Sequence, residues 1–114
     1  DEREKSILFI LNDNPADGRD VSWIWDARMD EVNQIEGLKT VQCSGRRAED
    51  IATRLKYDNL PVSLIKVDDN IKASIEQAVN QSDVEIVYIL PTYTAVFQTR
   101  DILLKIQERN QKWN

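Results

Sequence analysis

The chain has 114 residues, of which 41% are hydrophobic and 31% charged, and its formal net charge is −5. This length fits one domain with a sizeable core, and the balanced composition argues against disorder. The acidic charge excludes a broad basic surface, so we expect no nucleic-acid partner. No apolar run approaches the roughly 20 residues of a membrane-spanning helix and no signal peptide is evident, so we expect a cytoplasmic domain.

The chain contains no histidine and a single cysteine, Cys43. Because imidazole is the commonest general base, a self-contained Ser-His-Asp or Cys-His-Asp site cannot form on this chain, and any such site must be shared. One cysteine also excludes an internal disulfide. The charged opening DEREK, which lacks an initiator methionine, predicts that residues 1–114 are one domain excised from a longer polypeptide.

Five short apolar runs predict β-strands. The first is continuous and rich in branched residues, which is typical of a strand buried on both faces of a parallel sheet. The five runs are Ser6–Asn12, Val21–Trp25, Leu38–Ser44, Val62–Val67 and Val84–Leu90. Between and after the later runs, apolar residues repeat at the spacing of a helix. These are Ala48, Ile51, Ala52 and Leu55, then Ile71, Ile75, Ala78 and Val79, then Val96, Ile102, Leu103 and Ile106.

Turn and cap residues support this order of elements. Asn59 and Pro61 mark a turn between the first helix and the next strand. Side-chain oxygens can accept the unpaired N–H groups at a helix start, and the candidate caps are Asp68 or Asp69 for the middle helix and Thr92 or Thr94 for the last. Alternating strands and helices imply right-handed crossovers. The sequence therefore predicts a Rossmann-like α/β domain of three layers, with a mostly parallel sheet between helices.

In such sheets, ligands bind beyond the carboxyl ends of the strands. Three loops are expected there: Asp13–Asp20, Cys43–Arg47 and Pro91–Thr94. No G-x-x-x-x-G-K-[ST] motif is present, so none of them is a P-loop for a nucleoside triphosphate.

The first loop and its continuation carry four aspartates: Asp13, Asp17, Asp20 and Asp26. Aspartates commonly cap turns, and this is the simpler interpretation of any one of them. Four acids in a short segment repel one another, which favours a specific partner or cation for at least one. The spacing of a calcium-binding loop is absent, so we predict no metal site. Trp23 and Trp25 either pack in the core or contact another protein or domain.

The other two loops offer weaker signals. Arg46 and Arg47 could lower the pKa of Cys43, but no histidine is available as its base, so an unreactive cysteine is the simpler interpretation. Ser44 and Gly45 could form an anion-binding turn before the next helix. Thr92 and Thr94 either cap the last helix or face the binding crevice.

Three segments carry a resemblance to a known family: ADGRDVSWIWD (16–26), SGRRAEDIATRL (44–55) and YILPTYTAVFQTRDIL (88–103). They resemble the C-terminal domain of Mur ligases, and more closely that of the MurT-type subunits of lipid II isoglutaminyl synthases. The D-G-x-D-x-S-W-x-W-D core of the first segment looks like a family signature. The last segment is similar to the S-P-A-x-A-S-x-D-x-F ending of peptide-adding Mur ligases. ADGRD replaces their A-H-N-P turn, so their substrate contacts at that turn are not transferred to this chain.

The resemblance implies the Mur ligase C-terminal fold type and a role in an ATP-dependent amidotransferase. Such a ligase activates the α-carboxylate of D-glutamate in the lipid II stem peptide as an acyl phosphate, and ammonia converts it to D-isoglutamine. The ammonia comes from a separate GatD-type class I glutaminase. ATP and Mg²⁺ lie chiefly on the central Mur ligase domain, so this domain is expected to hold no cofactor and to be inactive alone.

The resemblance also implies that an aspartate of the signature completes the Cys-His pair of the glutaminase across the subunit interface. Asp20 is the first candidate because it lies in the most distinctive part of the signature, and Asp17 and Asp26 follow. Further candidate contacts to the partner or substrate are Arg19, Trp23, Trp25, Thr92 and Thr94.

The alternative is a receiver-like or small-molecule-binding regulatory domain, since receivers also carry paired acids after their first strand. Receivers need an acceptor aspartate at the end of the third strand and a lysine before the proline that follows the fifth. Here the third predicted strand ends at Cys43-Ser44, and Leu90 precedes Pro91.

Overall fold

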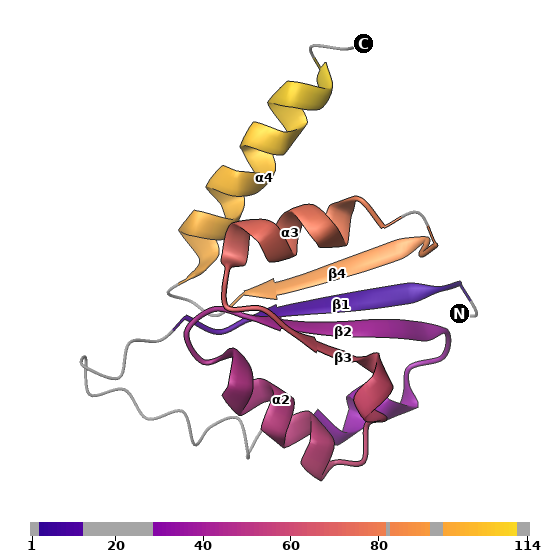
Figure 1. Cartoon of the computed structure of the whole chain (residues 1–114). Coiled ribbons are helices and arrows are strands. Elements are labelled where there is room, and N and C mark those ends of the chain that lie inside the picture. The colour runs from indigo at the N-terminus through magenta and orange to yellow at the C-terminus, as the bar shows by residue number, and fades with distance from the viewer. Residues whose placement is uncertain (1–2, 13–28, 82, 92–94, 112–114) are drawn as a thin grey trace.

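The computed structural model describes residues 3–12, 29–81, 83–91 and 95–111. They form a four-stranded sheet in the order β3-β2-β1-β4, and every neighbouring pair is parallel (Figure 1). The strands are β1 (Lys5–Ile10), β2 (Leu38–Ser44), β3 (Ile65–Val67) and β4 (Ile86–Pro91). The helices are α2 (Ala48–Tyr57), α3 (Ile71–Val79) and α4 (Val96–Gln111), with 3-10 helices η2 (Met29–Gln34) and η3 (Val62–Leu64). This arrangement confirms the predicted Rossmann-like α/β fold.

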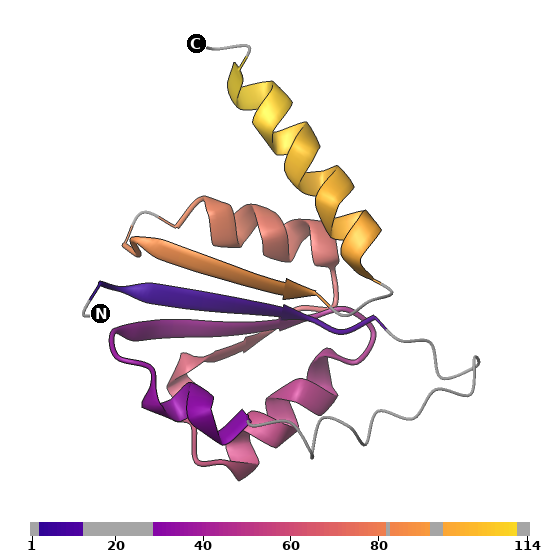
Figure 2. The same cartoon turned by 180° about the vertical axis from the view of Figure 1, so that it is seen from behind.

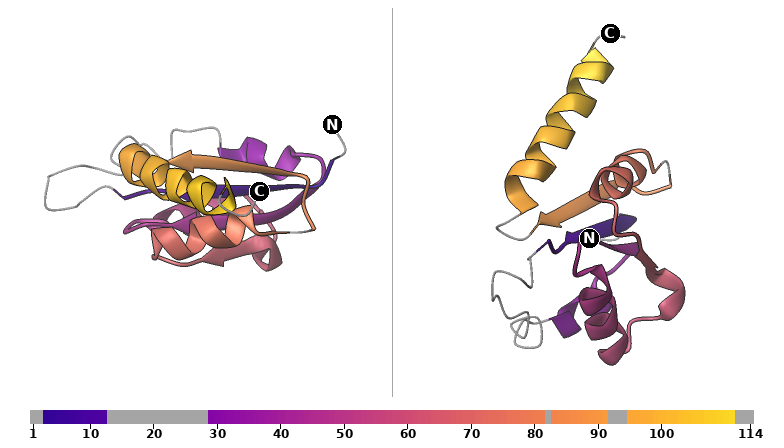
Figure 3. Two further views of the ribbon diagram at one scale, coloured as in Figure 1. Left: turned by 90° about the horizontal axis from the view of Figure 1, so that it is seen from above. Right: turned by 60° about the vertical axis from the view of Figure 1, so that its left-hand side comes forward.

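Helices cover both faces of the sheet and enclose two apolar cores. On one face, α2 and η2 pack over Ile7, Val41 and Cys43, and Figure 2 shows η2 beside α2. On the other face, α3 and part of α4 pack over Leu8 and Ile10. The view from above in Figure 3 has η2 and α3 on opposite sides of the sheet. Because successive residues of a strand point to opposite faces, the neighbours Ile7 and Leu8 join different cores.

Strand β1 is the central element of the sheet. It pairs with β2 on one side and with β4 on the other, and all of its residues except Phe9 are buried. The predicted strand Ser6–Asn12 is therefore confirmed in kind, although it runs from Lys5 to Ile10. β2 has the predicted bounds.

The predicted strand Val62–Val67 is wrong in its first half. Asn59 adopts a left-handed φ of 69° after α2, and the N–H of Leu64 then donates to the carbonyl of Pro61 at 3.0 Å. This bond winds residues 62–64 into η3, so only Ile65–Val67 remain to pair with β2. Asn59 and Pro61 do mark the predicted turn, but the turn continues into η3, which takes the place of the first half of the predicted strand.

The predicted caps of α3 are also wrong. Asn70 is the N-cap, and its Oδ1 accepts a hydrogen bond from the N–H of Ala73 at 3.0 Å. Asp68 binds the cap residue itself, because its Oδ1 accepts a hydrogen bond from the N–H of Asn70 at 3.0 Å. The sequence pattern was ambiguous here since three capping residues stand in a row, and the exposed Asp69 fills neither role.

The remaining boundaries differ little from the predictions. The last strand is Ile86–Pro91 instead of Val84–Leu90. The predicted core positions of α2 are all buried, whereas Val79 on α3 is 38% and Val96 on α4 is 40% exposed. The predicted strand Val21–Trp25 and the predicted caps Thr92 and Thr94 lie outside the described residues. None of the described helices is long and apolar enough to cross a membrane.

Candidate functional site

The carboxyl ends of the strands meet at one edge of the sheet. Ile10 is in register with Ser44 on one side and with Pro91 on the other, and Val67 at the end of β3 lies opposite Cys43. Parallel α/β sheets bind ligands at this edge. Of the three predicted loops, Cys43–Arg47 is fully described.

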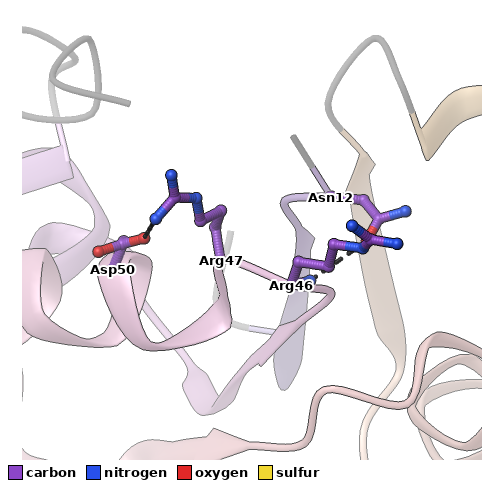
Figure 4. A network of polar contacts seen from close by, with 4 residues as sticks. All are labelled: Asn12, Arg46, Arg47 and Asp50. Carbon is purple, nitrogen blue, oxygen red and sulfur yellow. Dashed lines mark hydrogen bonds and ion pairs between the residues drawn. The ribbon is translucent and has the colours of Figure 1, made fainter. Parts of the chain in front are cut away.

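The turn between β2 and α2 is tied to the end of β1. The N–H of Leu11 donates to the carbonyl of Ser44 at 3.0 Å, and the N–H of Arg47 donates to the carbonyl of Leu11 at 2.9 Å. The N–H of Arg46 donates to Oδ1 of Asn12 at 3.2 Å, as Figure 4 shows. These three bonds hold Asn12, the residue that precedes the aspartate-rich segment, at the carboxyl edge.

Gly45 is required for this connection. Its φ is +90°, a conformation that side chains rarely adopt, and a Cβ at this position would lie 2.4 Å from the carbonyl oxygen of Leu11. The backbone of β1 and the turn can approach this closely only because position 45 has no side chain.

The predicted anion-binding turn is not what this segment forms. The N–H groups of Arg46 and Arg47 bond to Asn12 and Leu11, and the N–H of Ala48 donates to the carbonyl of Gly45 at 3.2 Å. An anion would need such N–H groups to be free. The side chain of Arg47 points along α2, and its Nη1 lies 3.5 Å from Oδ2 of Asp50 (Figure 4).

A pocket of about 390 Å³ opens between the start of α2 and the end of β3. Its charged side chains are one guanidinium, that of Arg46, and the carboxylates of Glu49, Asp68 and Asp69. Three carboxylates repel a triphosphate, so this pocket does not fit ATP. Within the described part of the chain, no group of three or more His, Cys, Asp or Glu side chains is placed to hold a metal ion.

Cys43 is a core residue. It is fully buried, and its side chain belongs to the core under α2. Burial raises the pKa of its thiol from 9.0 to about 12, and the nearby Glu49 adds to this rise. A nucleophilic cysteine needs the opposite shift, so the interpretation of Cys43 as unreactive is confirmed.

We expect the Cys43 thiol of the native protein to resist a thiol-specific disulfide reagent at about pH 8, and the same thiol to react fully after unfolding in guanidinium.

Because the folded pKa of about 12 exceeds the unfolded value of 9.0, this thiol contributes stability that is complete below the unfolded pKa. That contribution is lost as pH rises toward the folded pKa. Denaturant unfolding across this range, with Cys43→Ala as the control that lacks the thiol, measures the loss. Rapid labelling of the native protein would contradict the burial.

The other predicted site residues lie outside the described residues: Asp13, Asp17, Arg19, Asp20, Trp23, Trp25, Asp26, Thr92 and Thr94. Their roles stay predictions. Sequence reasoning missed Asn12, whose partner Arg46 lies 34 residues further along the chain. The only signal was a polar residue at the end of the predicted buried strand Ser6–Asn12.

The parallel sheet between helices defines a Rossmann-like domain. At the carboxyl edge of this sheet, hydrogen bonds join the glycine turn after β2 to the end of β1. Residues 1–96 match the MurT ligase C-terminal family, and the chain belongs to this family.

Two relatives show how much of a protein this chain represents. The lipid II isoglutaminyl synthase (glutamine-hydrolyzing) subunit MurT of Streptococcus pneumoniae (strain ATCC BAA-255 / R6) is 34% identical over 109 residues, which cover 96% of this chain and 24% of that protein. The protein of the same name from Staphylococcus aureus (strain COL) is 40% identical over 73 residues, which cover 64% of this chain and 16% of the relative. The chain thus spans about a quarter or less of the length of these relatives. Family membership leaves the receiver-like alternative without support.

Proposed function

We propose that this chain is the C-terminal domain of the ligase subunit of a glutamine-hydrolysing lipid II isoglutaminyl synthase. Its membership of the MurT ligase C-terminal family carries the proposal. The ligase amidates the α-carboxylate of D-glutamate in the peptidoglycan stem peptide. The central Mur ligase domain would hold ATP and Mg²⁺, which would supply the phosphoryl group that activates this carboxylate for attack by ammonia.

The ammonia comes from a separate GatD-type class I glutaminase. The chemistry of the present domain requires the Cys-His pair to lie outside it, because glutamine hydrolysis by that class needs a thiolate and a histidine. The single cysteine of this chain is buried and has a pKa of about 12. The chain contains no histidine. It therefore provides neither the nucleophile nor the base, and can contribute only an acid.

Asp20 is the acid that we assign to the Cys-His site of the glutaminase, with Asp17 and Asp26 as the next candidates. A carboxylate in this position holds the tautomer of the histidine and stabilises its charged form. The anchoring of Asn12 at the carboxyl edge supports the assignment, since it fixes where the Asp20 segment leaves the sheet. Trp23 and Trp25 brace the segment or touch the partner, and Arg19, Thr92 and Thr94 are further contacts.

Reconstitution tests the proposed function. The complete ligase subunit is mixed with lipid II, ATP and Mg²⁺, and receives either an ammonium salt or glutamine, with and without the glutaminase. We expect amidation from ammonium in both mixtures, but amidation from glutamine only when the glutaminase is present, as measured by mass spectrometry of the stem peptide. Amidation from glutamine without the second subunit would contradict the division of labour. Absence of amidation from ammonium would contradict the ligase function itself.

A further inference from the structure

Helix α4 is anchored to the rest of the domain by its first turn. Ala95, just before the helix, is 0% exposed, and Thr99 is 4% exposed. Among the α4 side chains that the structure describes, those of residues 96–109, Thr99 is the only buried one. Beyond this turn the helix rises away from the sheet (Figures 1 and 3), and Ile102, Leu103 and Ile106 are only partly buried. The outer part of α4 is therefore held less firmly than its start.

An open groove lies on each side of this outer part. The groove toward β4 has a volume of about 300 Å³, and its apolar lining includes Ile89 on the strand and Leu103 and Leu104 on the helix. The groove toward α3 has a volume of about 240 Å³, and α4 lines it with Ile102 and Ile106. Protein interiors are normally close-packed, so α4 fills neither side completely. Each side offers two incompletely buried apolar side chains of α4, so apolar burial does not strongly favour one side.

Electrostatics distinguishes the two sides. Toward α3, the groove is lined by three cations, Lys72 on α3 and Lys105 and Arg109 on α4. Glu76 on α3 is the one carboxylate among the described residues of this groove, and its Oε1 lies 3.5 Å from Nη2 of Arg109. Without this carboxylate, cations on both helices would repel one another across the groove. The described lining of the β4 groove has a single charged residue, Arg100. Glu76 is therefore the group that keeps α4 beside α3.

We propose that α4 is a hinged helix with two positions and that Glu76 selects between them. In the first position, which the structure shows, the Glu76 carboxylate holds α4 beside α3. When this attraction is removed or screened, α4 turns about its anchor at Ala95 and Thr99 into a second position, which closes the groove over β4. Leu104 then packs against Ile89. The inference concerns the packing of this domain and does not depend on the proposed function.

The anchor permits such a motion. The Oγ1 atom of Thr99 is buried and has no hydrogen-bond partner within the described part of the chain. No polar contact of this side chain therefore fixes the angle of the helix, and hinges are commonly a few residues at the end of an element. The β4 groove is also lined by Pro91, which ends β4 at the carboxyl edge of the sheet. Closing the groove would thus reshape the surface at the edge where parallel α/β sheets bind ligands.

Distance measurements in the complete ligase subunit test the inference. Nitroxide labels are attached through genetically encoded ketone side chains at the exposed positions Val79 on α3 and Glu108 on α4, so native cysteines do not interfere. Pulsed EPR of the otherwise wild-type subunit should show one main distance. Glu76→Gln should raise the share of a second, longer distance relative to the first by about 5-fold, the upper end of what one exposed ion pair contributes.

Asp101→Asn is the matched control. It removes a negative charge from an exposed position on α4 that is not among the residues lining either groove. The two distances should keep their wild-type shares in this variant. A shift as large as that of Glu76→Gln would overturn the inference, because any loss of negative charge would then move the helix.

Exchange of the two charges shows whether the Glu76–Arg109 pair is responsible. Glu76→Arg should shift α4 further than Glu76→Gln, because it adds repulsion to the lost attraction. The double variant Glu76→Arg with Arg109→Glu should restore the first distance, since a carboxylate again faces the cations of the groove. In the wild-type subunit, about 1 M salt should act in the same direction as Glu76→Gln, because the Debye length falls to about 3 Å. This salt series needs no substitution at the groove.

A further variant tests where the displaced helix goes. Adding Leu104→Ser to Glu76→Gln should lower the share of the second distance, because the second position buries Leu104 against β4. Hydrogen exchange of the amides of residues 100–107 should stay slow in Glu76→Gln, since the helix moves as a unit. Rapid exchange would show that α4 unravels instead, and would overturn the inference. Distances that stay the same in Glu76→Gln, Glu76→Arg and high salt would overturn it as well.

Discussion

Replacing Asp20 with asparagine in the complete ligase subunit should lower glutamine-dependent amidation of lipid II by up to about 10⁴-fold, the loss seen when the orienting acid of a catalytic triad becomes an amide. The neutral amide cannot stabilise the imidazolium that forms when the histidine of the glutaminase takes the cysteine proton. It also no longer fixes the tautomer of that histidine. Asp20→Asn should therefore reduce glutamine hydrolysis in the complex without changing how the ligase uses ammonia.

Two measurements check this expectation. Glutamate release reports the glutaminase reaction, and amidation from an ammonium salt reports the ligase reaction. Asp17→Asn and Asp26→Asn are the matched controls, because they remove a charge from the same segment and should have much smaller effects. Unchanged glutamine-dependent activity of Asp20→Asn in an intact complex would reject Asp20, and a large loss in one of the controls would identify the acting aspartate.

The second large effect is expected at Gly45, where an alanine should lower the free energy of unfolding by about 3 kcal/mol or more, since it combines a strained backbone with a steric overlap. The φ of +90° disfavours any Cβ, and the added carbon would lie 2.4 Å from the carbonyl oxygen of Leu11. That oxygen belongs to the backbone and accepts the N–H of Arg47, so it cannot move away without breaking this bond.

Gly37→Ala is the control for Gly45→Ala. Gly37 also has a left-handed φ, of 79°, but it lines an open surface pocket. Its replacement should cost only about 1 kcal/mol, which is the cost of the backbone conformation alone. Urea unfolding of both variants measures the difference. Equal losses would show that the overlap with Leu11 relaxes and that the connection between β1 and the turn tolerates a side chain.

Local sequence patterns correctly predicted some of the strands and helices. The apolar run Leu38–Ser44 is β2 to the residue, and the positions expected to be buried on α2 are buried. Both predictions rest on periodicity, which is a property of neighbouring residues. The predicted strand Val62–Val67 was wrong in its first half. Its β-branched residues suit a strand, whereas the hydrogen bond from Leu64 to Pro61 favours a 3-10 turn. Propensity alone does not decide between these two outcomes.

The features of the candidate site also fall into two groups, those that the sequence determined and those that only the tertiary structure decided. The sequence by itself determined the family resemblance and the absence of any histidine, because these depend on residue identity alone. It favoured an unreactive Cys43, which the burial of the thiol in the folded domain then confirmed. Only the tertiary structure decided that Asn12 is bound to Arg46, that Gly45 lies against Leu11 and that β4 lies at an edge of the sheet that the described residues form. Each of these joins or exposes segments far apart in the chain. Strand order and crossover geometry set such contacts, and no local pattern of residues contains them.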